Sequence, residues 1–158
     1  MHSSARVQLI RHGPGARGLR LGLGPGLRPA RALKQLQQLL NDHSFWAQGR
    51  SLRALGQMLR GSAAAVSLWQ GGQLVGFCRA SSDGLFRAVV WDVVVAPELQ
   101  GQGLGRQLVE ALLAQPPLRR VERVYLMTSN SAGFYRQLGF EAVGSQQLML
   151  RINMPSGP

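Results

Sequence analysis

The chain has 158 residues, of which 45% are hydrophobic, and this size predicts one domain with a single core over residues 1–158. No run approaches the roughly 18 uninterrupted apolar residues of a membrane-spanning helix, so we expect a soluble protein with no membrane partner. The formal net charge of +11 favours polyanionic partners without fixing a function.

The positive charge is concentrated at the amino terminus. Residues 1–41 carry a charge of +7, because they contain seven basic residues and no acidic one before Asp42. Such a field attracts nucleic acid, the ribosome or the phosphates of a cofactor equally well. We expect residues 1–14 to be a flexible basic leader that runs into a first strand. The Gly- and Pro-rich residues 12–29 leave room for at most one short strand, near residues 19–23.

Two helices are predicted next. Apolar residues recur at helical spacing over residues 30–40, and Asn41 followed by Asp42 supplies a stop. Ser51 is a good amino-terminal cap for a second helix, which Gly61 ends.

The pattern then changes to strands. Residues 64–69 and 73–79 are short β-prone runs joined by a hairpin turn at residues 70–72. Residues 88–96 are the strongest strand, and their near-continuous apolarity predicts burial on both faces.

The remaining elements alternate between helix and strand. Because this order follows helices and antiparallel strands, it predicts a mixed α/β sheet. We expect a helix over residues 103–114, a strand over 123–127, a short helix over 131–138, and late strands over 140–143 and 147–152.

A glycine-rich turn joins the strongest strand to the helix that follows it. The amino terminus of such a helix exposes unpaired backbone N–H groups, and its dipole favours negative charge. Gly101, Gly103 and Gly105 let a pyrophosphate approach this backbone, because they carry no Cβ atom. A dinucleotide fingerprint would need glycine where Arg106 stands, and a Walker loop would need Lys followed by Ser or Thr. A turn that binds no ligand is the remaining alternative.

Two segments carry a resemblance to a known family. Residues 100–105, with the sequence QGQGLG, look like the Q/R-x-x-G-x-G/A motif of the GNAT superfamily of acetyltransferases. Residues 133–140, with the sequence GFYRQLGF, resemble the family's F-Y-x-x-L-G-F segment. The similarity runs over residues 67–152. Residues 79–83 and 91–95 are similar to the plant plastid and cyanobacterial branch that includes serotonin N-acetyltransferase-like proteins.

The resemblance implies a fold, a donor and a set of binding residues. The sheet would be splayed between its fourth and fifth strands, with acetyl-CoA in the cleft and no metal ion. The backbone of Val93, Val94 and Val95 would bind the pantetheine arm and polarise the thioester. Asn130 would either bind the cofactor or cap the following helix. The pyrophosphate would be held by the amides of Gln100, Gly101, Gln102, Gly103, Leu104, Gly105 and Arg106.

The resemblance also implies catalytic residues. Tyr135 matches the tyrosine that protonates the departing CoA thiolate and also contacts the cofactor, although it could instead be a core-edge residue. An amine attacks only in its neutral form, and a free lysine amine has a pKa near 10.4, so a proton must be removed. Asp92 is the candidate base, because a carboxylate in an apolar strand is costly unless it is paired or functional. The alternatives are an ion pair with an arginine such as Arg79, and a water chain that carries the proton to solvent.

The sequence therefore predicts an acetyl-CoA-dependent N-acetyltransferase. The acceptor could be a small arylalkylamine, or a lysine or amino-terminal amine of a protein. The alternative is a noncatalytic protein that senses acyl-CoA or binds RNA or the ribosome through its basic segment. Cys78 is the only cysteine, which suits a reducing compartment such as the cytoplasm, and we expect it to be a buried hydrophobe. The oligomeric state, monomer or homodimer, stays open.

Overall fold

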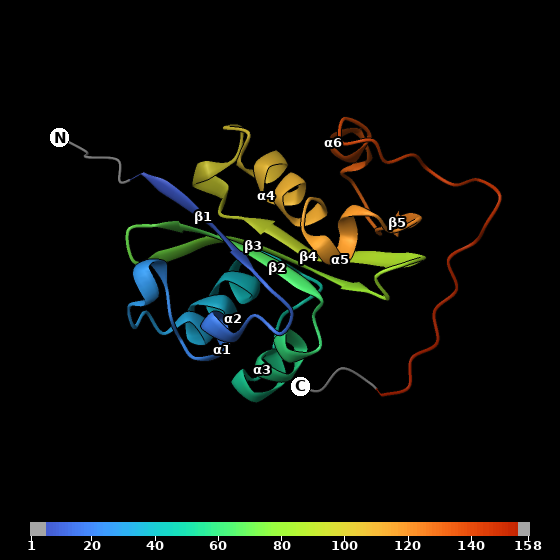
Figure 1. Cartoon of the computed structure of the whole chain (residues 1–158). Helices are drawn as coiled ribbons and strands as arrows, with labels where there is room; N and C mark the ends of the chain where they lie inside the picture. Colours follow the sequence, from blue (N-terminus) through green and yellow to red (C-terminus); the bar gives the residue numbers. More distant parts are fainter. Residues whose placement is uncertain (1–5, 155–158) are drawn as a thin grey trace. The chain divides into compact units, whose positions relative to one another are not determined.

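A five-stranded sheet forms the centre of the larger of the two units into which the chain divides. The computed structural model describes residues 6–154. The first unit ends at Leu126 and the second begins at Met127. The relative positions of the two units are not determined, so one domain over the whole chain stays a prediction. In the first unit, helices cover both faces of the sheet (Figure 1).

The strands lie in the sheet in chain order, β1-β2-β3-β4-β5. The first four pair antiparallel with their neighbours, and β4 pairs with β5 in parallel. The prediction of a mixed, mostly antiparallel α/β sheet is therefore confirmed. The strands are β1 Val7–His12, β2 Ala64–Gln70, β3 Gln73–Ser82, β4 Arg87–Val95 and β5 Arg123–Tyr125.

The segment before the first helices differs from its prediction. A flexible leader was expected up to residue 14, but Val7–His12 pairs along its whole length with β2. Burial explains this strand, because Val7 and Leu9 pack on one face of the sheet and Ile10 packs on the other. The alternation anchors the segment despite its positive charge. Residues 1–5 of the expected leader lie outside the described residues.

The short strand expected near residues 19–23 is also wrong. That stretch holds α1, Arg17–Arg20, and the 3-10 turn η1, Pro25–Leu27. Only a single bridge joins Leu23 to Pro29. Gly22 and Gly26 both have positive φ, and these reversals prevent an extended run.

The helices pack on the sheet in two layers (Figure 1). On one face α4 covers a core that includes Val66, Cys78 and Leu108. On the other face α1, α2 and α3 cover a core that includes Trp69 and Phe77. Ser51 caps α3 as predicted, accepting the Ala54 N–H at 3.1 Å. The bounds are α2 Ala32–His43, α3 Leu52–Arg60, α4 Leu104–Leu113 and α5 Pro116–Arg119.

Cys78 belongs to β3, and its fully buried side chain faces α4. Its sulfur is 3.6 Å from the carbonyl oxygen of Leu108. Burial raises the pKa of the thiol well above its ordinary value, so the nucleophilic thiolate is suppressed. The expectation of a buried hydrophobe is confirmed.

The sheet opens between β4 and β5. Their parallel pairing covers only residues 87–89 of β4, and the last pair is Val89 with Tyr125. Strand β4 continues to Val95, whereas β5 ends at Tyr125. Within residues 6–154, the second half of β4 therefore has a strand neighbour on one side only, which agrees with the splay that the resemblance implies.

In the second unit, the described residues 127–154 contain one helix, α6, at Ala132–Arg136. The strands predicted at residues 140–143 and 147–152 are wrong, since residues 137–154 contain no further helix or strand. Leu148, Leu150 and Ile152 are exposed there. Local alternation suggests a strand, but a strand also needs a neighbour to satisfy its backbone groups.

A partly buried histidine, His12, links β1 to β2. The Trp69 indole N–H donates to Ser67 Oγ at 2.9 Å, and that oxygen lies 2.7 Å from His12 Nε2. The hydroxyl proton of Ser67 is thus available to the imidazole nitrogen. Burial lowers the pKa of His12 from 6.5 to about 4, because the charged form would lose its hydration.

We expect this histidine to make stability fall with acid. Below pH ~6.5 an unfolded histidine binds a proton, whereas folded His12 binds one only near pH 4. The free energy of unfolding should therefore be unaffected by His12 above pH 6.5 and decrease as the pH falls towards 4. Urea melts of wild type and His12→Gln across this range measure the slope. Equal slopes for the two proteins would contradict the assignment, and His43→Gln, which removes an exposed histidine, is the control.

Candidate active site

The turn after β4 has the geometry of an anion site. It passes through the 3-10 turn η2, Pro97–Leu99, and reaches α4 at Leu104. Gly101 and Gly103 have φ of +83° and +77°, a conformation that side chains with a Cβ rarely adopt. The side-chain amide of Gln100 donates to the carbonyl oxygen of Val95 at 3.1 Å and closes the turn.

The start of α4 leaves donors available to a ligand. The first helical hydrogen bond runs from Gln107 N–H to Gly103 O at 3.1 Å. Within the described chain, the N–H groups of Leu104, Gly105 and Arg106 have no backbone acceptor. The first turn contains no acidic side chain. A Cβ built on Gly101 or Gly103 would meet no atom within 4 Å, so the backbone faces open space and fits a pyrophosphate.

The strand before this turn has an edge without a strand partner in the described part of the chain. Strand β3 pairs with Val94 and Val95, and the β5 ladder ends at Val89. Among the described residues, the main-chain groups on the side of Val93–Val95 away from β3 have no strand partner, although the carbonyl of Val95 accepts from the Gln100 side chain. The turn and the second half of β4 bring together the residues predicted from Val93 to Arg106.

A β-bulge interrupts β4 at Asp92. On β3 the pairing advances from Phe77 to Arg79, while on β4 it moves from Val94 to Trp91, so β4 has one extra residue. Asp92 has φ of +56°, in the left-handed region. The bulge changes which side chains face which layer: Val90 packs with α4, whereas Val94 packs in the opposite core.

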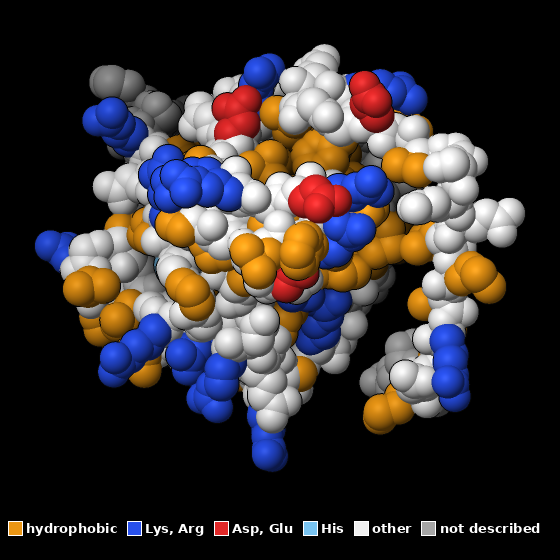
Figure 2. All heavy atoms as spheres, turned by 45° about the vertical axis from the view of Figure 1, so that its right-hand side comes forward, with side chains coloured by type: hydrophobic (Ala, Val, Ile, Leu, Met, Phe, Trp, Pro, Cys, Tyr) orange, Lys and Arg blue, Asp and Glu red, His pale blue; other side chains and the backbone are white. Residues whose placement is uncertain are grey.

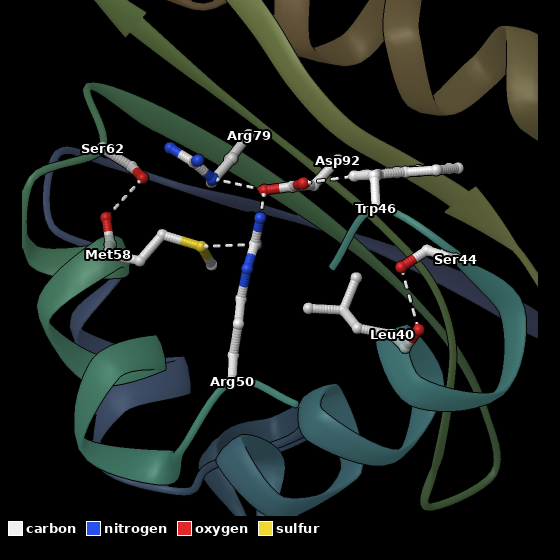
Figure 3. A network of polar contacts seen from close by, with 8 residues as sticks. All are labelled: Leu40, Ser44, Trp46, Arg50, Met58, Ser62, Arg79 and Asp92. Carbon is white, nitrogen blue, oxygen red and sulfur yellow. Dashed lines mark hydrogen bonds and ion pairs between the residues drawn. The ribbon is translucent and has the colours of Figure 1, made fainter. Parts of the chain in front are cut away.

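The bulge places the Asp92 carboxylate in a network of three donors (Figure 3). Its side chain is 3% exposed. One oxygen accepts from Arg79 Nε at 2.8 Å and from Arg50 Nη1 at 3.2 Å. The other accepts from Trp46 Nε1 at 3.0 Å. The ion pair with Arg79, the alternative to a catalytic base, is present.

Arg50 and Trp46 are partners of Asp92 that the sequence did not reveal. They come from residues 44–51, which join α2 to α3, and they lie 42 and 46 positions from Asp92 in the chain. A carboxylate in an apolar strand indicates that a cationic partner is present, but the sequence pattern does not identify that partner. No local pattern marks Arg50 or Trp46 as that partner.

We expect Asp92 to contribute strongly to stability. Asp92→Asn removes the charge between Arg50 and Arg79, which are 31% and 17% exposed. The free energy of unfolding should fall by roughly 2–4 kcal/mol, and the melting temperature by about 5–12 °C. Glu122→Gln is the matched control, because Glu122 also faces two arginines but is 52% exposed. Equal melting temperatures for Asp92→Asn and wild type would refute the structural role.

Tyr135 and Asn130 belong to the second unit. The Tyr135 ring packs edge-on against Phe134 at 4.9 Å and Phe140 at 5.9 Å between centroids. The helix begins after Ser131, whose hydroxyl donates to Asn130 Oδ1 at 3.1 Å. Asn130 is thus not the residue that caps α6. Whether these two side chains meet the strand and turn stays a prediction.

The surface is strongly basic. Figure 2 shows Lys and Arg side chains spread over the face drawn, with few acidic ones between them. This matches the net charge of +11 and favours the approach of a polyphosphate. Among the described residues, no helix is both long and apolar enough to cross a membrane.

Comparison with known proteins identifies the family. The profile described as the acetyltransferase (GNAT) family matches residues 33–140, which include the bulge, the turn and α6. The chain belongs to the GNAT acetyltransferase family. A solved structure from Xanthomonas campestris pv. campestris, described as belonging to the GNAT family, matches this GNAT protein with a TM-score of 0.71. It is 28% identical, and the match covers 95% of each chain.

Curated relatives show which members of the family this chain is similar to. The uncharacterized N-acetyltransferase ycf52 of Pyropia yezoensis is 36% identical over 113 residues, which cover 68% of this GNAT chain. The chloroplastic serotonin N-acetyltransferase 2 of Oryza sativa subsp. japonica is 50% identical over 70 residues, or 44% of the chain. These matches span 64% and 35% of the relatives' own lengths. The predicted similarity to plastid members of the family is therefore confirmed.

Proposed function

We propose that this GNAT protein transfers an acetyl group from acetyl-CoA to a primary amine. The observation that carries the proposal is the continuous strand, turn and helix start from Val93 to Arg106. Its open backbone groups fit a pantetheine arm followed by a pyrophosphate, and two left-handed glycines leave space for the phosphates. Family membership supports acetyl-CoA as the donor.

The proposed reaction is direct attack in a ternary complex. The amine nitrogen bonds to the acetyl carbonyl carbon, the carbon–sulfur bond breaks, the nitrogen loses a proton and the sulfur gains one. A backbone N–H of Val93, Val94 or Val95 polarises the carbonyl oxygen. Tyr135 donates a proton to the departing thiolate, which makes the thiolate a better leaving group.

The ion pair of Asp92 bears on how the amine loses its proton. Both carboxylate oxygens already accept hydrogen bonds from fixed donors, which favours a structural role over that of a base. We therefore propose that the proton leaves through water. The base role makes a different prediction: Asp92→Asn would then remove the acidic limb of the pH–rate profile. An unchanged profile with a lower melting temperature supports the ion pair.

The acceptor and partners are proposed from chemistry alone. A relative named serotonin N-acetyltransferase supports a small arylalkylamine, while a lysine or amino-terminal amine of a protein is the other acceptor class. The basic surface supports contact with nucleic acid or the ribosome as an additional property. A noncatalytic acyl-CoA-sensing role would show binding without turnover.

The deciding experiment measures thiol release from acetyl-CoA against a panel of primary amines. We expect amine-dependent release of CoA above the rate of hydrolysis without amine. Tight binding of acetyl-CoA with no release for any amine would support the sensing role. Absence of acetyl-CoA binding in calorimetry would refute the proposed function.

A further inference from the structure

Residues 44–51 hold two aromatic side chains at the surface. Phe45 is 75% exposed and Trp46 is 47% exposed. Their rings meet edge to face, with centroids 5.1 Å apart and planes at 87°. Exposed pairs of large aromatic side chains are costly to leave in water and often mark binding surfaces.

This segment is firmly attached, so the exposure is not the result of a loose loop. Ser44 Oγ donates to Leu40 O at 2.8 Å at the end of α2. Gly49 N–H donates to Asn41 Oδ1 at 2.9 Å. Ala47 is 1% exposed and lies in the core beneath. The backbone that carries the aromatic pair is therefore fixed.

Asp92 ties the same segment to β4. It accepts from both Trp46 and Arg50, and the Arg50 guanidinium also lies 3.3 Å from the sulfur of Met58 on α3 (Figure 3). Asp92 directly precedes Val93. Through its hydrogen bond to Asp92, Trp46 therefore contacts β4, the strand to which we assign binding of the thioester.

We propose that Phe45 and Trp46 form the surface that receives a flat apolar group of the acceptor, and that Asp92 is the residue that positions it. This inference rests on the proposed acetyl transfer. The carboxylate is outnumbered by two guanidinium groups, Arg50 and Arg79, so the cluster carries an excess positive charge. That charge disfavours a second cationic group on the acceptor and favours a neutral amine beside an aromatic ring. The acceptor class is therefore an arylalkylamine rather than a lysine-rich peptide.

The test compares two amines on defined variants. The probes are 2-phenylethylamine, which has a ring, and n-butylamine, which has none. Trp46→Phe keeps an aromatic ring and deletes the N–H that binds Asp92, and Phe45→Ala removes the partner ring. Phe86→Ala is the matched control, because Phe86 is another exposed phenylalanine, 56% accessible, on the loop between β3 and β4.

For 2-phenylethylamine, we expect Phe45→Ala and Trp46→Phe to raise KM by roughly 3- to 10-fold, the size of an aromatic contact. The kcat, the KM for acetyl-CoA and the KM for n-butylamine should stay within about twofold, a split that general destabilisation would not produce. Phe86→Ala should match wild type. Equal KM changes for both amines, or faster transfer to a lysine-rich peptide than to 2-phenylethylamine, would overturn the inference while leaving acetyl transfer intact. No turnover with any amine would refute the proposed function itself.

Discussion

Tyr135→Phe should lower kcat by roughly 10- to 1,000-fold while leaving the affinity for acetyl-CoA nearly unchanged. The substitution keeps the ring that packs against Phe134 and Phe140 and deletes only the hydroxyl group. If that hydroxyl protonates the thiolate, the loss falls on the chemical step. Single-turnover rates and calorimetry of acetyl-CoA binding measure the two quantities separately.

Tyr125→Phe is the matched control for this experiment. Tyr125 is the other tyrosine of the chain and lies at the end of β5, outside the residues assigned to binding. Its variant should turn over at the wild-type rate. Full turnover by Tyr135→Phe, across a pH series with a good acceptor, would exclude the acid role.

Gly103→Val should abolish detectable binding of acetyl-CoA. A side chain at this position would project into space that no protein atom occupies within 4 Å, where we place the pyrophosphate. Because φ at Gly103 is +77°, valine also strains the backbone by on the order of 1–2 kcal/mol. A loss of binding must therefore be separated from a loss of stability.

Gly84→Val separates the two effects. Gly84 lies between β3 and β4, has φ of +80° and is also free of atoms within 4 Å of an added Cβ. The melting temperature should fall by a similar amount in both variants. Only Gly103→Val should fail to bind acetyl-CoA in calorimetry. Undiminished binding by a folded Gly103→Val would remove the central argument for the donor site.

The sequence predicted the elements whose signals are local. The two helices before β2, the hairpin at Gly71, the strongest strand and the helix after Gly103 all follow from spacing, caps and glycines over a few neighbouring residues. The partners of Asp92 could not be predicted, because Arg50 and Trp46 approach from a distant segment. The bulge was also hidden, since an aspartate rather than a glycine occupies its left-handed position. The prediction of the late strands was wrong for the converse reason. The alternation at Leu148 and Leu150 is a local signal, but the described residues provide no strand that pairs with this segment.

The chain order of the sheet has a consequence for how the protein folds. Strands β2, β3 and β4 are joined by short turns, so their pairing closes small loops and costs little chain entropy. Strand β1 instead joins β2 across a long separation, with His12 and Ser67 55 positions apart. Non-local pairing of this kind is slow, because its entropic cost precedes its contacts. During synthesis, β1 leaves the ribosome before β2 does, so β1 stays without its strand partner until β2 has followed it.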